Sequence, residues 1–125
     1  MGYHVVDPED VEPTPDRPSE HRSISDYCDL EKMALNVYRV EPGEPLPLAY
    51  HVHAEQEEAF VVLAGTLHVE TPEGEKVVPE GNIFVAEPES PHRAFVPEDA
   101  EETVRAVAIG APPVDDVRPY EPDDE

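Results

Sequence analysis

The sequence predicts an all-β protein built from antiparallel strands. Short runs rich in β-branched and aromatic residues recur along the middle of the chain. Turn signals made of Pro, Gly and acidic residues separate these runs at intervals of about eight to twelve residues. No segment of useful length shows helical periodicity. Strands at this spacing are typical of an antiparallel sandwich or barrel.

Each predicted strand lies next to a turn signal. The turn signals are PGEP at 42–45, PEG at 72–74 and 79–81, PESP at 88–91 and PED at 97–99. The first strand is the only one with a helical competitor, DLEKMALNV, whose β-branched end leads directly into Pro42. In the run AFVVLAG, the residues on both faces of the strand are apolar. One face can therefore fill a barrel while the other packs against a second sheet or a partner. The predicted strands are 33–40, 58–64, 66–71, 75–78, 82–87, 92–96 and 103–110.

Acidic residues and prolines crowd both ends of the chain, whereas the apolar runs lie between them. A length of 125 residues is ordinarily one domain. We therefore expect three segments: an extended acidic Pro-rich arm over residues 1–22, a β-barrel over 23–110, and an acidic Pro-rich tail over 111–125.

The charge of the chain excludes two classes of partner. Thirty Asp and Glu residues oppose eight Lys and Arg residues, for a formal net charge of -22. The arginines form no run, and phosphate binding needs clustered cations. We expect neither nucleic acid nor membrane as a partner. A carboxylate-rich surface with only two lysines, Lys32 and Lys76, is also typical of proteins from halophilic organisms.

Cys28 is the only cysteine, so an intrachain disulfide and a Cys-rich zinc site are excluded. The beginning, MGYHVVDPEDVEP, has no basic segment followed by an apolar run. We expect Cys28 to be a small buried hydrophobe and the protein to be cytoplasmic.

Histidines and carboxylates gather in one stretch, LAYHVHAEQEEAFVVLAG, over residues 48–65. Alternate residues of a strand face the same side, so His51 and His53 project together, roughly 6.6 Å apart along the backbone. A third histidine, His92, follows a proline turn. Neutral imidazoles with one carboxylate suit a first-row metal such as Zn, Fe, Mn, Ni or Cu. We expect one divalent transition metal per chain.

Two residues compete for the carboxylate position. Uninterrupted alternation from His53 places Glu57 on the histidine face, but the AEQ turn between them can reset the phase and select Glu58. The other histidines are expected to take no part: His4 and His21 lie in the arm, and His68 occupies a solvated strand position.

The spacing of these residues resembles that of the cupins. The first cupin motif is usually Gly, five residues, His-x-His, three or four residues, Glu, six residues and Gly. Here His51, His53, Glu58 and Gly65 stand at the positions from His-x-His onward. The leading glycine departs from the motif, since Gly43 lies two positions further from His51 than the motif expects. Counting back from Gly65, as the motif does, selects Glu58 as the carboxylate ligand.

The second cupin motif has a Gly, then a Pro, then a His eleven positions after the Gly. Gly81, Pro88 and His92 match it. Asn82 replaces the motif's usual Asp, which affects the turn and removes no ligand. The resemblance covers residues 33 to about 110.

This resemblance implies a double-stranded β-helix, also called a cupin or jelly-roll barrel, with His51, His53, Glu58 and His92 as metal ligands near one mouth. It further implies a homodimer and a small-molecule ligand. Further pocket candidates are Tyr50, Phe60, Phe84 and Phe95 as walls, and Arg39 or Arg93 as an anion clamp.

Cupins host many reactions, so two hypotheses of function stay open. The first is a metal-dependent enzyme, such as a dioxygenase or an isomerase, that acts on a small oxygenated molecule of the hydroxy-acid, carboxylate or sugar type. The second is a non-catalytic module that binds or senses a small ligand.

Overall fold

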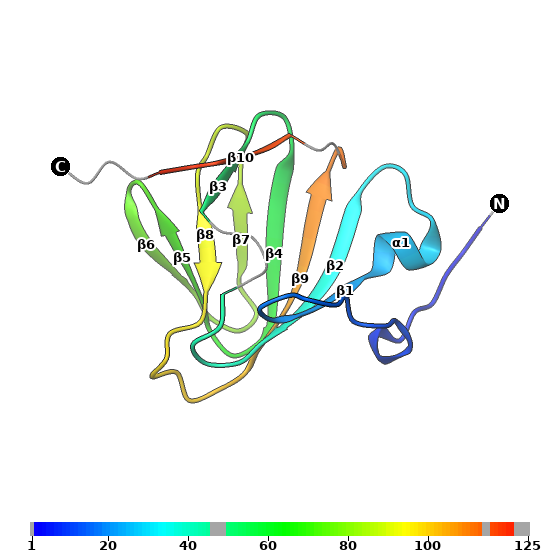
Figure 1. Ribbon diagram of the computed structural model, residues 1–125, viewed down its shortest axis with the longest axis horizontal. Coiled ribbons are helices and arrows are strands. Elements are labelled where there is room, and N and C mark those ends of the chain that lie inside the picture. The colour runs from blue at the N-terminus through cyan, green and yellow to red at the C-terminus, as the bar shows by residue number, and fades with distance from the viewer. Residues whose placement is uncertain (1, 46–49, 114–115, 122–125) are drawn as a thin grey trace.

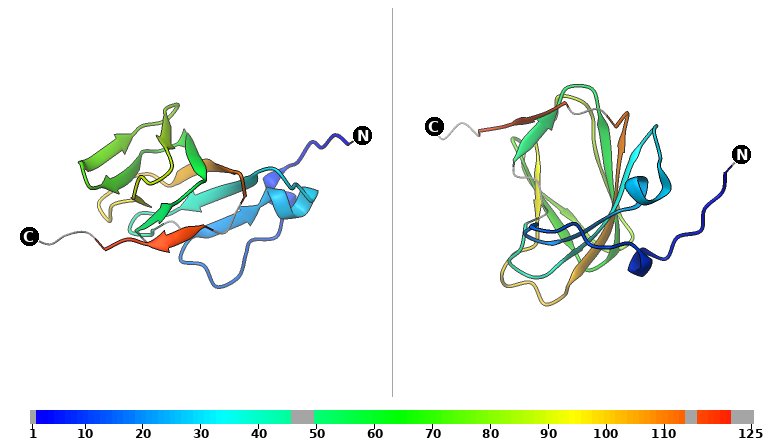
Figure 2. Two further views of the ribbon diagram at one scale, coloured as in Figure 1. Left: turned by 90° about the horizontal axis from the view of Figure 1, so that it is seen from above. Right: turned by 45° about the vertical axis from the view of Figure 1, so that its right-hand side comes forward.

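The computed structural model describes residues 2–45, 50–113 and 116–121. These residues form antiparallel sheets that face each other and curve into a small barrel (Figure 1). The view in the right panel of Figure 2 shows the two walls of the barrel, with the C-terminal segment across one end.

A five-stranded sheet forms one wall. Its order is β1-β2-β9-β4-β7, so strands from both ends of the chain meet at its centre. All neighbours in it pair antiparallel. The strands are β1 (Glu20–Ser23), β2 (Ala34–Val40), β9 (Val104–Ala111), β4 (Glu57–Ala64) and β7 (Ile83–Ala86).

Two smaller sheets form the opposite wall, in the orders β6-β5-β8 and β10-β3. A bridge between His51 and His92 joins them at the edge where β8 begins. The strands are β3 (His51–His53), β5 (Leu67–Thr71), β6 (Gly74–Val78), β8 (Arg93–Phe95) and β10 (Val117–Pro119).

The all-β prediction is confirmed, and each predicted run contains a strand of the structure. The segment DLEKMALNV ends in β2 and not in a helix. The described residues include one short 3-10 helix, η1 (Pro8–Asp10), and one α-helical turn, α1 (Ile24–Cys28). The Ser23 hydroxyl caps α1, and Asp29 ends it in the left-handed conformation. Among the described residues, neither helix has the length or the apolar character to span a bilayer.

Strand pairing extends into both predicted flanks. β1 begins at Glu20, and its buried His21 hydrogen-bonds Thr14 at 2.8 Å and Asn36 at 2.9 Å. β10 lies in the predicted tail and pairs with β3. The sequence predicted neither pairing, because short polar strands next to prolines carry little β signal. The domain limits themselves stay a prediction.

The core lies between the two walls and consists mainly of alternate residues of the strands. Val62 of β4, Leu67 and Val69 of β5 and Val104 of β9 are buried almost completely. The neighbouring residue Leu63 points away from the core and is 49% exposed. This alternation gives β4 one face toward the core, as the period of a strand requires.

Leu67 and Leu63 provide a matched test of this core. We expect Leu67→Ala to lower the free energy of unfolding by about 2–5 kcal/mol, because it removes a fully buried side chain and leaves a cavity. We expect Leu63→Ala to cost only about 0.5 kcal/mol, because its side chain is half exposed. Urea unfolding of both variants measures the difference, and similar losses would contradict the assignment of faces.

Candidate metal centre

His51 and His92 lie directly opposite each other across the bridge between β3 and β8. The N–H of His51 donates to the carbonyl of His92 at 3.1 Å, and the N–H of His92 donates to the carbonyl of His51 at 2.9 Å. Both side chains are buried, and their ring centroids are 4.5 Å apart. Backbone pairing therefore brings together two histidines that are far apart in the sequence.

His53 follows two positions after His51 on β3 and faces the same site. Its ring centroid is 4.9 Å from that of His51, and the two ring planes are nearly perpendicular. The His53 Nε2 atom is buried and has no hydrogen-bond partner among the described residues. A buried polar atom without such a partner is costly unless another group satisfies it.

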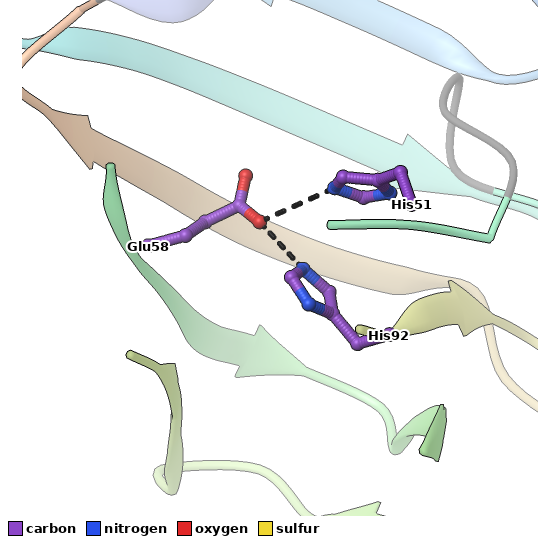
Figure 3. Close-up of side chains that lie close together, drawn as sticks. All are labelled: His51, Glu58 and His92. Carbon is purple, nitrogen blue, oxygen red and sulfur yellow. Dashed lines mark hydrogen bonds and ion pairs between the residues drawn. The ribbon is translucent and has the colours of Figure 1, made fainter. Parts of the chain in front are cut away.

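Glu58 of β4 reaches this group from the opposite wall (Figure 3). Its Oε1 atom is 2.7 Å from Nε2 of His92, 3.7 Å from Nε2 of His51 and 3.9 Å from Nε2 of His53. Burial raises the pKa of the Glu58 carboxyl, but its interactions with His51 and His92 outweigh that effect and lower the pKa to about 2. The carboxylate is thus held in its charged form.

The structure distinguishes between the two candidate carboxylates. Glu57 is exposed at the start of β4, whereas the Glu58 side chain is only 12% exposed. Residues 54 and 55 form a bend between β3 and β4. The bend resets the phase of alternation, so the second glutamate and not the first shares the histidine side.

The residues present fit a divalent metal. One ligand atom from each of His51, Glu58 and His92 lies within 4.8 Å of the other two. Two ligands of one metal lie up to about 4 Å apart, because each bond is about 2.0–2.2 Å long, so a small contraction would close this group around an ion. Imidazole nitrogens with one carboxylate oxygen are a donor set for first-row metals.

Two neighbouring groups hold the Nδ1 atoms of His92 and His53, the ring nitrogens that do not face Glu58. His92 Nδ1 donates to the carbonyl of Ser90 at 2.9 Å, which turns Nε2 toward Glu58. His53 Nδ1 lies 2.8 Å from Oδ1 of Asp116. The sequence interpretation missed Asp116, because nothing in the acidic tail distinguishes it from its neighbours.

Two of the predicted pocket walls are at the site. Phe60 and Phe84 pack together with centroids 6.1 Å apart, and both contact His92, at 6.2 and 5.7 Å. A cavity of about 310 Å³ lies between β6 and β7, the edge strands of the facing sheets, and Phe84 and His92 line it. The cavity is therefore adjacent to the candidate metal centre.

The other predicted pocket residues are elsewhere. Phe95 and Arg93 stack on each other at 4.8 Å, on the face of β8 opposite the buried Ala94. Arg39 is exposed and pairs with Glu41 at 3.5 Å. These residues do not line the cavity beside His92, because strand alternation turns them outward.

Tyr50 also departs from the prediction, since its ring packs against Tyr120 at 5.0 Å. His68 pairs with Glu75 at 2.9 Å and is partly exposed, on the face of β5 opposite its buried neighbours. Cys28 is partly exposed at the end of α1. None of these described side chains belongs to the His51, Glu58 and His92 cluster.

Fold and site together define a small β-barrel protein with a candidate metal centre inside the barrel. The Cupin domain family matches residues 36–110, which is more than half of the chain. The chain therefore belongs to the cupin family. The cupin prediction is confirmed, and so is the jelly-roll class of the fold.

Solved structures show the same fold at low sequence identity. The polyketide cyclase RemF from Streptomyces resistomycificus is 20% identical with a TM-score of 0.78, over 98% of this chain and 89% of that one. A sugar phosphate isomerase from the cupin superfamily of Silicibacter pomeroyi is 22% identical with a TM-score of 0.73, over 86% and 75% of the chains. A predicted oxalate decarboxylase from Thermotoga maritima is 12% identical with a TM-score of 0.73, over 86% and 98%. No curated protein sequence matches the chain.

Proposed function

We propose that this cupin is a metal-dependent enzyme that acts on a small oxygenated molecule. One divalent transition metal per chain is held by four side chains: His51, His53, Glu58 and His92. The observation that carries the proposal is the convergence of three ligand atoms within 4.8 Å in a buried site. His53 completes the set, because its buried Nε2 has no hydrogen-bond partner among the described residues and lies 3.9 Å from the same carboxylate oxygen.

When bound, such a metal supplies Lewis acidity toward a substrate oxygen or a redox centre for dioxygen. The chain contributes the rigid mounting of the ligands. β3, β4 and the start of β8 each carry part of the set, so the sheets fix the ligands before any ion arrives. Phe60 and Phe84 contribute an apolar wall beside His92.

The charges around the cavity favour an uncharged substrate, such as a hydroxyketone, a diketone or a neutral sugar. Among the described residues that line the cavity, Lys76 carries the one positive charge, and Glu73 pairs with it at 3.6 Å. Glu89 adds a further carboxylate, which pairs at 3.0 Å with Arg118, a residue outside the cavity lining. An anionic substrate would meet a negative field outside the metal centre, on a chain of net charge -22.

The alternative is a non-catalytic module that binds or senses a small ligand. One observation favours it: the acidic side chains that line the cavity have cationic partners, Glu73 with Lys76 and Glu89 with Arg118. The described lining residues therefore offer no uncommitted acid or base for proton transfer. Ligand-dependent thermal shifts without turnover would favour this alternative.

Metal content and turnover test the proposal. The protein is expressed in defined media with Mn, Fe, Co, Ni, Cu or Zn, its metal is measured, and turnover is assayed on pairs of neutral substrates and their carboxylate or phosphate analogues. We expect stoichiometric metal and turnover of neutral molecules. If the chain holds none of these metals, the metal-dependent function is ruled out.

Glu58→Gln and Glu57→Gln form a matched pair for the carboxylate ligand. We expect Glu58→Gln to weaken metal binding at least about 100-fold, since even the loss of an outer hydrogen-bond partner costs about 10–100-fold. Glu57→Gln removes one charge from an exposed neighbour and should leave the affinity unchanged. Competition with a chromophoric chelator measures both affinities, and equal effects would contradict the assignment of Glu58.

The predicted homodimer, the halophilic origin and the cytoplasmic location stay predictions.

A further inference from the structure

We propose that Asp116 is a positioning residue of the metal centre: it holds His53 in the tautomer with its proton on Nδ1, which leaves Nε2 to bind the metal. This inference rests on the proposed function, because His53 must be a ligand for its tautomer to matter. It assigns a role to the C-terminal segment, which the sequence interpretation placed outside the barrel.

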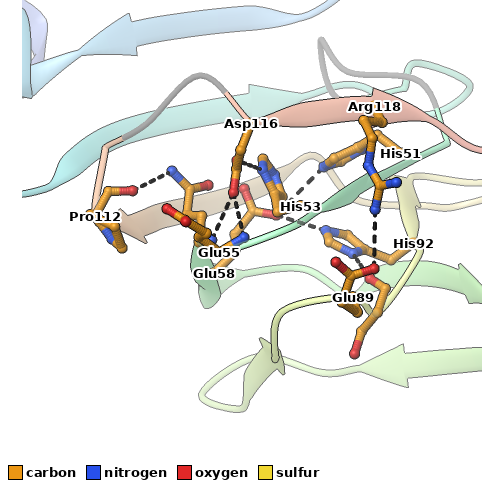
Figure 4. Close-up of polar contacts among 11 residues, drawn as sticks. His51, His53, Glu55, Glu58, Glu89, His92, Pro112, Asp116 and Arg118 are labelled. Carbon is orange, nitrogen blue, oxygen red and sulfur yellow. Dashed lines mark hydrogen bonds and ion pairs between the residues drawn. The ribbon is translucent and has the colours of Figure 1, made fainter.

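The contacts of Asp116 use both of its carboxylate oxygens (Figure 4). Oδ1 lies 2.8 Å from Nδ1 of His53. Oδ2 accepts from the backbone N–H of Glu55 at 2.6 Å and from that of Gln56 at 2.9 Å. The Asp116 side chain is only 13% exposed, so water competes little for these positions.

These contacts determine where the imidazole proton lies. An ionised carboxylate can only accept hydrogen bonds, so Nδ1 of His53 must donate to it. In a neutral imidazole the other nitrogen then carries a lone pair. That nitrogen is Nε2, the buried atom that has no hydrogen-bond partner among the described residues. A metal ligand needs this lone pair, and a partner at the second nitrogen is the usual way to secure it.

The strand that follows Asp116 keeps it in place. β10 pairs with β3 in the register Val117 with His53 and Pro119 with His51. Gln56 Nε2 donates to the carbonyl of Pro112 at 3.1 Å, ahead of Asp116 in the chain. Arg118 reaches Glu89 at 3.0 Å on the turn before His92. Contacts before and after Asp116 thus hold it next to β3, the strand that carries His51 and His53.

The groups that bind Nδ1 of His92 and Nδ1 of His53 differ in how far along the chain they lie. His92 is oriented by the Ser90 carbonyl, two residues away on the same turn. His53 is oriented by a residue 63 positions later in the chain. Orientation of His92 is therefore local, whereas that of His53 requires the C-terminal segment to be docked.

Asp116→Asn is the sharpest test, because it keeps the shape of the side chain and reverses the direction of its hydrogen bond with Nδ1 of His53. The backbone N–H groups of Glu55 and Gln56 need an acceptor, so the amide oxygen of the new side chain turns toward them. Its NH₂ group then faces Nδ1 of His53 and donates to it. The imidazole proton moves to Nε2, where it blocks the metal.

We expect two results from this variant. In the metal-free protein, the ¹⁵N shifts of His53 should show the imidazole proton on Nδ1 in the wild type and on Nε2 in Asp116→Asn. Metal affinity, measured by chelator competition, should fall about 10–100-fold. Asp116→Ala provides no partner and should give a mixture of tautomers with an affinity between the two, so it also tests the proposal if the Asn variant folds poorly.

Glu55→Gln is the matched control. It removes one negative charge from an exposed side chain beside Asp116 and keeps the backbone N–H that donates to Asp116, so tautomer and affinity should stay as in the wild type. An unchanged tautomer in Asp116→Asn, or a reversed tautomer with unchanged affinity, overturns the inference. A wild type that binds no metal is a failure of the proposed function, and the inference fails with it. A wild type that binds metal no more tightly than Asp116→Asn overturns the inference alone.

Discussion

Replacement of both His51 and His92 by alanine is expected to abolish stoichiometric metal binding while the barrel stays folded. These histidines supply two of the three ligand atoms in the cluster of His51, Glu58 and His92. The variant leaves Glu58 and His53 as the remaining donors, and two donors hold a divalent ion far more weakly than four. We expect the metal affinity to fall by more than about 100-fold, because loss of a ligand costs more than the roughly 10–100-fold lost with a hydrogen-bond partner of a ligand. Elemental analysis after gel filtration measures the metal that stays bound.

The barrel should survive because most of its apolar core is formed by other side chains. The apolar cluster is formed by residues such as Val62, Leu67 and Val104, and neither histidine belongs to it. The variant does change Glu58, since His51 and His92 are the neighbours that lower the pKa of its carboxyl. Without them burial dominates and raises that pKa, so the carboxyl can stay buried in its neutral form.

The control is a second double variant, His4→Ala with His68→Ala. It also removes two imidazoles, but His4 is exposed and His68 pairs with Glu75 away from the site. We expect wild-type metal content and an unchanged far-UV circular dichroism spectrum. Equal metal content in both double variants would place the metal elsewhere in the chain.

Gly65→Ala is expected to be the most destabilising of the glycine substitutions in the turns. Gly65 connects β4 to β5 with φ of +75°, a region in which an L side chain costs about 1–2 kcal/mol. A Cβ atom here would also lie 2.8 Å from the carbonyl oxygen of Thr103 and 3.2 Å from Cα of Val104. Both contacts are with backbone atoms of the adjacent segment at the start of β9, so a change of rotamer cannot relieve them.

Gly81→Ala separates the two causes of this destabilisation, backbone strain and steric clash. Gly81 has a similar φ of +85°, but nothing lies within 4 Å of a Cβ at that position. We expect Gly81→Ala to cost only the backbone strain, about 1–2 kcal/mol, and Gly65→Ala to cost about 1–3 kcal/mol more because of the steric clash. Urea unfolding of both variants measures the difference, and equal losses would contradict the close approach at Gly65.

Much of the barrel could be predicted from local pattern. Strands such as β4 and β9 combine β-branched composition with clear turn signals, and these features act within a few residues of each other. The same holds for the histidine pair of β3, whose period of two puts both rings on one side. β1 and β10 carry no such signal, since they are short, polar and stabilised by the strands they pair with.

The outward position of Arg93 and Phe95 could have been found from the sequence. Counting from His92, both stand at odd spacings, which places them on the opposite face of a regular strand. The same counting fails for Glu58, because the bend at residues 54 and 55 interrupts the alternation. Alternation is informative within one strand and loses its meaning across an irregular turn.

Residue chemistry and spacing over short distances were enough to predict most of the strands, the family resemblance and the types of ligand. The folded chain was needed to see that His51 and His92 are backbone partners, that Glu58 faces them from the other wall, and that Asp116 returns to His53. These contacts arise when distant strands pair in one register to close the barrel, and no local pattern encodes that register.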